Sequence, residues 1–425
     1  MTNEAQPKDT MISVEEARQV VLSRVEPLPV ETVPLLEALG RVAAAPATSD
    51  IDVAPFAHSA MDGFALKAAQ IADASEGFPV QLKVIAEIGA GSVYEGPLAA
   101  DECVRIMTGA ELPEAADSVV KYEVVDVVSG DGKPGSVVSF GAPCSVGSNV
   151  RAAGEEAKAG EVVLQPGDVL GAAGMGCLAS CGVLEVETYR RPQVAIMATG
   201  SELVPPDQVP GSGHIRESNG RAMAACVREA GGVPEILPIV PDTYDDLFQA
   251  VTKAAQEFDF VITTGGAANG DYDFIKQVVD DAGQLFMTQV NMRPGKAQTF
   301  GHVQGTPVFG LPGNPAAAYC GFQMLIRPAL RKMQGYEALE FPQIRARLTQ
   351  DMKKKDPRRI LLRATYANAS EGGYEVTPAK NQSSGLFGVI QRSNCMAVIP
   401  EGLASLKAGD EVACILMGVP EETVL

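Results

Sequence analysis

Four glycine-containing segments in the second half of the chain combine residue types that suit the binding of an anion. Glycine lets the backbone approach a ligand closely, and a helix that begins after such a segment supplies N–H donors and the positive end of its dipole. Each segment alone also has the composition of an ordinary turn. A standard ATPase loop is absent, and no G-x-G-x-x-G follows a strand. The segments are Thr199–Glu202, Thr264–Asp273, Arg293–Lys296 and Leu311–Pro315, and they contain Gly200, Gly265, Gly266, Gly313 and Asn314.

Three acidic residues lie in or beside these segments, namely Glu202, Asp242 and Asp273. Carboxylate oxygens are hard ligands that suit Mg²⁺, which commonly bridges protein carboxylates to phosphates. The alternative is that Asp242 and Asp273 only cap the helices that follow them. The pattern therefore predicts a magnesium site and leaves helix capping open.

Basic residues near the same segments are candidates for an oxyanion pocket. Arg293 and Lys296 flank a proline and a glycine, and Arg358, Arg359 and Arg363 lie in a β-like run. Arginine and lysine bind oxyanions through charge-assisted hydrogen bonds. The alternative is a set of ordinary solvated charges on a turn and on a strand surface.

The first half of the chain contains two further polar strings. His58–Ala65 includes Asp62, and Arg151 is followed by a loop that contains Glu156. Asp62-Gly63 is also a turn dipeptide, and the segment that follows Arg151 could be a charged surface loop. The alternative is that the segment with Arg151 and Glu156 lines a cleft, and both interpretations stay open.

The elements around the glycine segments alternate between strand and helix, which predicts a parallel, doubly wound sheet. Such sheets bind ligands at the carboxyl ends of their strands. The expected strands are Gln193–Ala198, Val233–Val240, Phe260–Thr264 and Thr306–Leu311; the expected helices are Asn219–Ala230, one capped by Thr243, Asp271–Asp281 and Pro315–Met333.

The flanking regions have other patterns. A capping box formed by Ser13 and Glu16 starts an N-terminal helix, and from about Ile51 to Gly167 the chain consists of short β-like runs. We expect a packed helix composed of small residues after Gly167. After Tyr336 the chain returns to β runs that predict a small barrel or sandwich, at Ile344–Leu348, Ile360–Tyr366, Met396–Ile399 and Val412–Met417.

Composition limits the classes of function. The 425 residues carry a formal charge of −19, which disfavours binding to nucleic acid or to an anionic membrane. Eight cysteines form no C-x-x-C pair and only three histidines are present, so we expect reduced thiols and no zinc site. The start of the chain lacks a signal-peptide pattern, and the uncharged stretch Val169–Leu184 is too short and too rich in glycine to span a bilayer. We therefore expect a cytoplasmic protein.

Taken together and in order, these strings resemble the molybdopterin molybdenumtransferase family, which includes the bacterial MoeA proteins and the E domain of gephyrin. The resemblance covers nearly the whole chain, and eight ordered matches make it specific. His58–Ala65 resembles S-A-M-D-G-[YF]-A, Arg105–Ala110 R-I-x-T-G-A, Asn149–Glu156 N-[IV]-R-x-x-G-E-D, Ala198–Leu203 S-T-G-D-E-L, Thr263–Asp273 T-S-G-G-V-S-x-G-x-x-D, Met292–Lys296 K-P-G-K, Leu311–Ala316 L-P-G-N-P and Arg358–Ala364 R-R-x-x-L-R-A.

The resemblance implies a mixed α/β and β multidomain fold. It implies an elongated N-terminal region (1–50 and 142–190), an inserted β-rich lobe (51–141), a doubly wound α/β domain like those of MogA and MoaB (191–335), and a C-terminal β-barrel (336–425). It also implies a homodimer in which the α/β domain of one subunit and the lobe of the other form the active cleft.

The resemblance further implies insertion of molybdate into adenylylated molybdopterin with Mg²⁺ and release of AMP, as the final step of molybdenum cofactor biosynthesis. Partners would include a pterin-adenylylating enzyme and apo-molybdoenzymes or their chaperones. By position, the resemblance implies that Mg²⁺ would be held by Glu202, Asp242 and Asp273. The lobe side of the cleft would contribute Asp62, Thr108, Arg151 and Glu156, and pterin phosphate and nucleotide would be bound by Gly200, Gly265, Gly266, Gly313 and Asn314. The molybdate pocket would be lined by Arg293, Lys296, Arg363, Ser383 and Ser384.

The chain departs from the family pattern at several positions. Arg293 replaces a usual lysine and Glu156 an aspartate, both with charge retained, whereas Gln289 replaces a common lysine and Ser201 an aspartate. Ala268 and Asn269 replace a serine and an apolar residue. Three alternatives follow: a homologue that prefers tungstate, a gephyrin-like scaffold that binds a partner peptide, and a plain nucleotide hydrolase.

Overall fold

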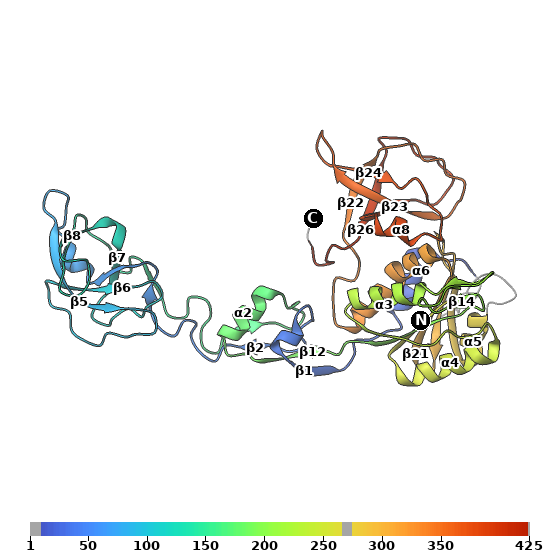
Figure 1. Ribbon diagram of the computed structural model, residues 1–425, viewed down its shortest axis with the longest axis horizontal. Helices are drawn as coiled ribbons and strands as arrows, with labels where there is room; N and C mark the ends of the chain where they lie inside the picture. Colours follow the sequence, from blue (N-terminus) through green and yellow to red (C-terminus); the bar gives the residue numbers. More distant parts are fainter. Residues whose placement is uncertain (1–9, 266–273, 424–425) are drawn as a thin grey trace, which may run out of the picture. The chain divides into compact units, whose positions relative to one another are not determined.

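The computed structural model describes residues 10–265 and 274–423, and the chain divides into two compact units. The main unit consists of Met1–Glu31, Gly40–Ala44 and Glu187–Leu425, and the lobe unit of Thr32–Leu39 and Ala45–Val186. Figure 1 shows the elements of each unit. In the part of the chain that the structure describes, no helix combines the length and the apolar character needed to cross a membrane.

The α/β part of the main unit is built on a sheet with the strand order β16-β13-β17-β21-β20-β18. The first four strands are parallel, as predicted: β16 (Val233–Ile236), β13 (Gln193–Ala198), β17 (Phe260–Thr264) and β21 (Thr306–Leu311). β20 (Ala297–Val303) and β18 (Gly283–Gln289) are antiparallel to their neighbours and add an edge that the sequence analysis did not predict.

The reason for this antiparallel edge is a tight turn between β20 and β21. Gln304 and Gly305 have φ angles of 53° and 89°. Two consecutive positive φ angles are characteristic of the hairpin turn that matches the twist of two antiparallel strands. A crossover helix is therefore not needed at this connection.

Both faces of the sheet are covered by helices. On one face lie α1 (Val14–Leu22), α3 (Asn219–Glu229), and the continuous run of α6 (Pro315–Gly321), the π-helical segment Phe322–Ile326 and α7 (Arg327–Met333). On the other face lie α4 (Tyr244–Glu257) and α5 (Phe274–Ala282).

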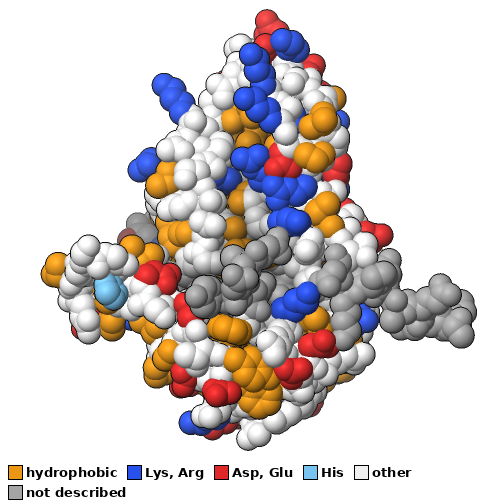
Figure 2. Space-filling view, turned by 90° about the vertical axis from the view of Figure 1, so that its right-hand side faces the viewer, with side chains coloured by type: hydrophobic (Ala, Val, Ile, Leu, Met, Phe, Trp, Pro, Cys, Tyr) orange, Lys and Arg blue, Asp and Glu red, His pale blue; other side chains and the backbone are white. Residues whose placement is uncertain are grey.

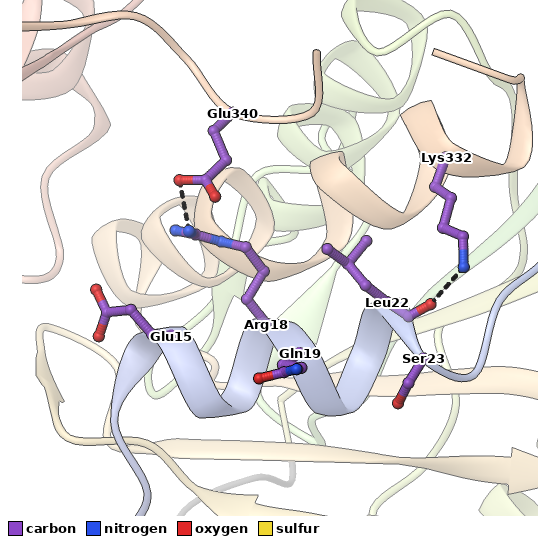
Figure 3. Close-up of a pocket in the computed structure, with 7 residues that line it drawn as sticks. All are labelled: Glu15, Arg18, Gln19, Leu22, Ser23, Lys332 and Glu340. Atoms are coloured by element: carbon purple, nitrogen blue, oxygen red, sulfur yellow. Dashed lines mark hydrogen bonds and ion pairs between the residues drawn. The ribbon is translucent and has the colours of Figure 1, made fainter. Parts of the chain in front are cut away.

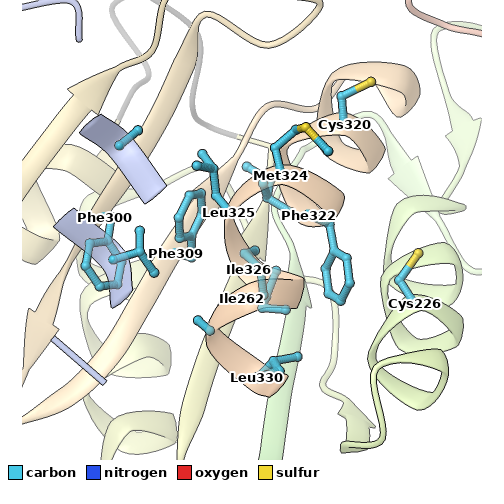
Figure 4. Close-up of a cluster of buried hydrophobic side chains, with 14 of the residues drawn as sticks. Cys226, Ile262, Phe300, Phe309, Cys320, Phe322, Met324, Leu325, Ile326 and Leu330 are labelled. Carbon is cyan, nitrogen blue, oxygen red and sulfur yellow. The ribbon is translucent and has the colours of Figure 1, made fainter. Parts of the chain in front are cut away.

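Alternate residues of one strand enter the two cores, as the pleat requires. Ile196 of β13 belongs to the core on the α3 side, and Met197 to the core on the α4 side. Figure 4 shows the first of these cores, where Ile262, Phe300 and Phe309 of the sheet meet the side chains of the π-helical segment. Complete burial of such side chains contributes roughly 1.5–3 kcal/mol each, so the two cores fix the strand ends that carry the site.

The end of the main unit is a barrel, as the β runs after Tyr336 predicted. The strands β23 (Arg359–Asn368), β24 (Tyr374–Pro378), β22 (Gln343–Leu348), β26 (Glu411–Leu416) and β25 (Cys395–Ile399) pair in this order, and β25 pairs back onto β23 to close the barrel. The two-residue strand β19 (Met292–Arg293) pairs in parallel with β23. This pairing joins the Arg293 segment of the α/β part to the barrel.

The lobe unit contains a mixed sheet with the strand order β7-β4-β6-β5-β9-β8. Its strands are β7 (Ser118–Lys121), β4 (Gly63–Leu66), β6 (Glu102–Ile106), β5 (Val80–Ile88), β9 (Val137–Phe140) and β8 (Val125–Ser129). Phe64 and Ala65 of β4 lie in separate cores on the two faces of this sheet. The predicted small-residue helix is α2 (Ala172–Ser180), in which Met175 and Leu178 are buried.

Candidate active site

The carboxyl ends of three parallel strands lie side by side in register. Ala198 of β13 is paired with Thr264 of β17, and Thr264 is paired with Leu311 of β21. The chain continues this pairing beyond the strands, because the Thr199 N–H donates to the Thr264 carbonyl (2.8 Å) and the Gly265 N–H to the Leu311 carbonyl (3.1 Å). Three of the four predicted glycine segments therefore meet at one edge of the sheet.

Gly265 is required by the close approach of these segments. Its φ is +98°, and a Cβ atom there would lie 2.1 Å from the carbonyl oxygen of Thr199. The nearest atom to a Cβ at Gly313 would be the Cα of Gly265, at 3.5 Å. A side chain at Gly265 would force the loops apart. This glycine is therefore needed for the packing of the loops, whether or not a ligand is bound there.

Asn219, at the start of α3, supports the same edge and was not predicted. Its amide donates to the Gly313 carbonyl at 2.8 Å, while its buried Oδ1 has no partner among the described residues. An unpaired buried acceptor is unusual in proteins and is often found at a functional site.

Asp242 and Glu202 provide the two described carboxylates at this edge. Asp242 Oδ2 accepts from the Ser201 N–H at 3.1 Å, which links the loops after β16 and β13. The Glu202 carboxylate folds back over Gly200, where a Cβ would lie 2.7 Å from Glu202 Oε2. The residue that caps α4 is Thr243, whose hydroxyl accepts from the Asp246 N–H, so the interpretation of Asp242 as a cap was wrong.

These two carboxylates fit the donor set of a magnesium ion. Mg²⁺ is commonly held by one or two carboxylates together with water and substrate phosphates. The predicted Asp273 and Gly266 lie outside the described residues. Within the described ranges, no group of three or more His, Cys, Asp or Glu side chains is arranged to hold a metal ion.

The segment 292–296, the loop that carries Ser384, and the start of α6 meet at a second part of the site. A Cβ at Gly295 would lie 3.1 Å from the Ala317 carbonyl, and the Ala316 N–H donates to the Ser384 carbonyl at 2.7 Å. The N–H groups of Ala317 and Ala318 both donate to the Asn314 carbonyl at 3.0 Å. The expectation of free N–H donors at the start of this helix was therefore wrong for α6.

Arg363 is buried, with 2% of its surface exposed. Its guanidinium donates to the carbonyls of Leu361 (3.3 Å), Ser383 (3.4 Å) and Gln382, while its Nε has no partner among the described residues. Burial, and the nearby charge of Arg293, lower the pKa of Arg363. The alternative of a solvated charge on a strand surface is excluded.

The other arginines of the predicted basic run are paired with carboxylates. Asp356 accepts from Arg293 at 3.1 Å and from Arg358, and these contacts hold the pKa of Asp356 well below its usual range. Arg359 pairs with Glu15 and with Glu401 (3.0 Å). In the view of Figure 2, Lys and Arg side chains gather over the barrel.

Lys296, Ser383 and Ser384 complete the predicted pocket residues. No hydrogen bond or ion pair joins the Lys296 side chain to another residue within 10–265 or 274–423, and this side chain is half-buried. Ser383 is exposed and its N–H is held by Asn381 Oδ1 at 2.9 Å. The structure therefore places these residues on the two segments that meet at α6.

The lobe unit brings together two of its predicted residues. Asp62 Oδ1 accepts from the N–H (2.7 Å) and the hydroxyl (2.6 Å) of Thr108, and these two bonds lower the pKa of Asp62. Arg151 lies in β10 (Val150–Arg151), where it is opposite His58 of the antiparallel strand β3 (His58–Ser59). Glu156 is exposed, and its backbone N–H donates to the Val53 carbonyl at 3.2 Å.

A surface hollow of about 440 Å³ lies between α1 and α7 (Figure 3) and contains none of the predicted residues. Arg18 pairs with Glu340 at 2.5 Å, and the Lys332 ammonium donates to the Leu22 carbonyl at 2.8 Å. We assign it no ligand, because these charges are already satisfied. Its lining residues are Glu15, Arg18, Gln19, Leu22, Ser23, Lys332 and Glu340.

Sequence reasoning missed Asn219, Asp356 and Gln382. Asp356 gave a signal, since it is the one acidic residue in the run Lys353–Arg359. Asn219 and Gln382 gave none, because their contacts join segments that are distant in the sequence.

Three family models match this chain in order. They are the MoeA N-terminal region (domains I and II) at residues 12–182, the probable molybdopterin-binding domain at 195–332, and the MoeA C-terminal region (domain IV) at 345–417.

Curated relatives and solved structures agree with these models. The molybdopterin molybdenumtransferases of Staphylococcus aureus strain COL and Staphylococcus epidermidis strain RP62A are 36% and 34% identical, over 96% of this chain and 96% of theirs. Two structures of the molybdopterin biosynthesis MoeA protein from Pyrococcus horikoshii have TM-scores of 0.79, with 32% and 27% identity, over 96% of this chain and 99% and 100% of theirs. On these findings, the chain belongs to the molybdopterin molybdenumtransferase family.

Proposed function

We propose that this protein inserts molybdate into adenylylated molybdopterin in a Mg²⁺-dependent reaction that releases AMP and the molybdenum cofactor. The observation that carries the proposal is the buried Arg363 guanidinium, which binds the Gln382–Ser383 carbonyls and keeps one N–H unpaired. A buried cation with no carboxylate partner among the described residues favours an anionic ligand. The names of the curated relatives indicate which reaction this would serve.

The sheet edge would bind the nucleotide and pterin phosphates. Glu202 and Asp242 would hold Mg²⁺ together with Asp273, and the Ser201 N–H fixes the orientation of the Asp242 carboxylate. When bound, Mg²⁺ supplies the charge neutralisation that phosphoryl cleavage needs. Gly200, Gly265, Gly266, Gly313 and Asn314 would let the backbone approach the substrate closely.

The segments around α6 would bind molybdate. Arg293, Lys296 and Arg363 would provide positive charge, and Ser383 and Ser384 would provide neutral donors. Preorganised donors of this kind stabilise an oxyanion because they need no reorganisation when charge develops. Tungstate has nearly the same size and charge, so it is the competing ligand to test.

The lobe residues would complete the site in a homodimer. Asp62, Thr108, Arg151 and Glu156 of one subunit would serve the cleft of the other. We propose the four-part division at 1–50 with 142–190, 51–141, 191–335 and 336–425, a cytoplasmic location, and transfer of the product to apo-molybdoenzymes or their chaperones.

The test is transfer of the metal to a recipient enzyme. Purified protein, adenylylated molybdopterin, Mg²⁺ and molybdate are incubated and then mixed with an apo-molybdoenzyme, whose activity is measured. We expect activation that requires molybdate and is lost when Mg²⁺ is chelated during the incubation. Failure to activate, with a known family enzyme active in parallel, would overturn the proposal, and activation by tungstate alone would change the substrate.

A further inference from the structure

Asp356 is a carboxylate that contacts Arg293, one of the cations of the proposed oxyanion pocket. Its side chain is 12% exposed. Its Oδ1 accepts from the backbone N–H (3.0 Å) and the Nε (2.9 Å) of Arg358, and its Oδ2 accepts from Arg358 Nη2 (2.5 Å) and Arg293 Nη1 (3.1 Å). One carboxylate therefore binds two arginines at once.

The two arginines differ in how firmly they are held. Arg358 contacts Asp356 through three donors, and its Nη1 also donates to the Met292 carbonyl at 3.4 Å. Arg293 has a single bond to Asp356, and 55% of its side chain is exposed. An arginine has five N–H donors, so most of the donors of Arg293 stay unused by the residues that the structure describes.

The local charge shows which cation an incoming anion would meet. Arg359 is already neutralised by Glu15 and Glu401. Arg363 is buried, and Arg293 lies on β19, which pairs with β23, the strand that carries Arg363. Arg293 is therefore the exposed cation of this group, and Asp356 is the carboxylate next to it.

We propose that Asp356 is a positioning residue of the oxyanion pocket, which holds Arg293 in place and competes with the incoming oxyanion for it. This inference rests on the proposed function, in which Arg293 and Arg363 bind molybdate. The Asp356 carboxylate repels a bound anion and reduces the positive charge that Arg293 offers. Its presence sets a weaker affinity for molybdate, which favours release of the oxyanion to the pterin.

The charge of the ligand gives a test that a purely structural role would not pass. Coulomb repulsion scales with the charge of the ligand, so removal of the carboxylate benefits a dianion twice as much in free energy as a monoanion of the same shape. Molybdate is a tetrahedral dianion, and perrhenate is a tetrahedral monoanion of similar size. Asp356→Asn removes the charge and keeps an oxygen that can accept from the Arg358 N–H.

The experiment is equilibrium dialysis of the full chain against molybdate or perrhenate, with the metal content measured in each compartment. We expect Asp356→Asn to bind molybdate about three- to tenfold more tightly and perrhenate only about two- to threefold more tightly. Asp356→Glu, which keeps the charge, should stay within about twofold of wild type. In an Arg293→Ala background, Asp356→Asn should keep the gain that comes from direct repulsion of the anion and lose the part that acts through Arg293.

Asp351→Asn is the matched control. Asp351 pairs with Lys407 at 2.8 Å and lies five residues before Asp356 on the same barrel, and its pair is exposed. This variant should bind both anions as wild type does. If Asp356→Asn lowers the melting temperature, Asp356→Ser provides a second neutral side chain.

The outcomes separate this inference from the proposed function. Unchanged or weaker molybdate binding by folded neutral variants, or an equal gain for both anions, would overturn the role of Asp356 while Arg363-dependent binding still supported the pocket. If wild-type protein bound no molybdate, or if Arg363→Ala left the binding unchanged, the pocket assignment and the inference would fail together.

Discussion

The carboxylate of Asp242 accepts a hydrogen bond from the backbone N–H of Ser201 at 3.1 Å, and this bond ties together the loops that follow β16 and β13. The next residue, Thr243, caps α4. Thr243 therefore supplies the cap of α4, and the Asp242 carboxylate is not used as a cap. No described residue bonds the other oxygen of the Asp242 carboxylate, while Thr243 stabilises the helix.

This division predicts that Asp242→Asn abolishes AMP release with little change in stability. The amide keeps an acceptor for the Ser201 N–H, so the free energy of unfolding should fall by no more than about 1 kcal/mol. The loss of charge should remove Mg²⁺ binding at the phosphate. Asp245→Asn, in the first turn of the same helix, is the control and should keep full activity. Wild-type AMP release by Asp242→Asn would remove this residue from the mechanism, and we expect the same loss for Asp273→Asn.

Arg363→Ala should raise the molybdate concentration for half-maximal insertion about ten- to a hundredfold. Loss of one charge-assisted hydrogen bond in a desolvated pocket costs roughly 1.5–3 kcal/mol. Binding of adenylylated molybdopterin should change much less. Molybdate titrations of AMP release, with separate binding measurements for the pterin, distinguish the two effects.

Arg347→Ala is the control for Arg363→Ala. Arg347 lies on β22 of the same barrel and donates to the Gly372 carbonyl at 3.1 Å. Its titration curve should overlap that of wild type. An equal loss for molybdate and pterin in Arg363→Ala would indicate a distorted Gln382–Ser384 loop and would count against direct oxyanion binding.

Mixed dimers of Asp62→Asn and Asp242→Asn subunits should regain activity. If Asp62 serves the cleft of the partner subunit, a heterodimer carries one intact cleft and should show about half of the wild-type activity. Each variant alone should be inactive. The measurement is AMP release by differently tagged, purified heterodimers, and no recovery would place both residues in the same subunit's cleft.

Thr108→Val should raise the pKa of Asp62 toward its ordinary value. The Thr108 hydroxyl and N–H hold the ionised carboxylate, so the pKa of Asp62 is lowered in the folded protein. A lowered pKa means that these bonds stabilise the fold above the ordinary pKa of an aspartate, and that this contribution is lost as the pH falls through the lowered value. NMR titration of the Asp62 carboxyl carbon measures the shift, and an unchanged pKa in Thr108→Val would contradict the assigned cause.

Much of the fold that positions the site could be predicted from local sequence. The strands β13, β17 and β21 have the predicted bounds, because each is an apolar run that ends in a glycine-containing loop. The antiparallel edge strands β18 and β20 were missed, since they mix polar and apolar residues. The only local signal for the turn between β20 and β21 is Gln304-Gly305, a dipeptide less distinctive than Asn-Gly.

The burial of Arg363 could not be predicted from its neighbours in the sequence. An arginine within a β run is expected on the surface. Its burial depends on the loop that contains Gln382 and Ser383, which accepts its hydrogen bonds from about twenty residues further along the chain. The same holds for Arg359, whose partner Glu15 lies in α1. The pairing of the basic run thus depends on tertiary contacts that no local pattern encodes.

Insertion of molybdate is best tested by measuring AMP release from adenylylated molybdopterin by the purified protein with Mg²⁺, with and without molybdate. We expect molybdate to trigger release of one AMP for each molybdenum cofactor formed, and Arg363→Ala to shift this response to higher molybdate concentrations. AMP release that is indifferent to molybdate, or no release while a known family enzyme is active under the same conditions, would contradict this expectation.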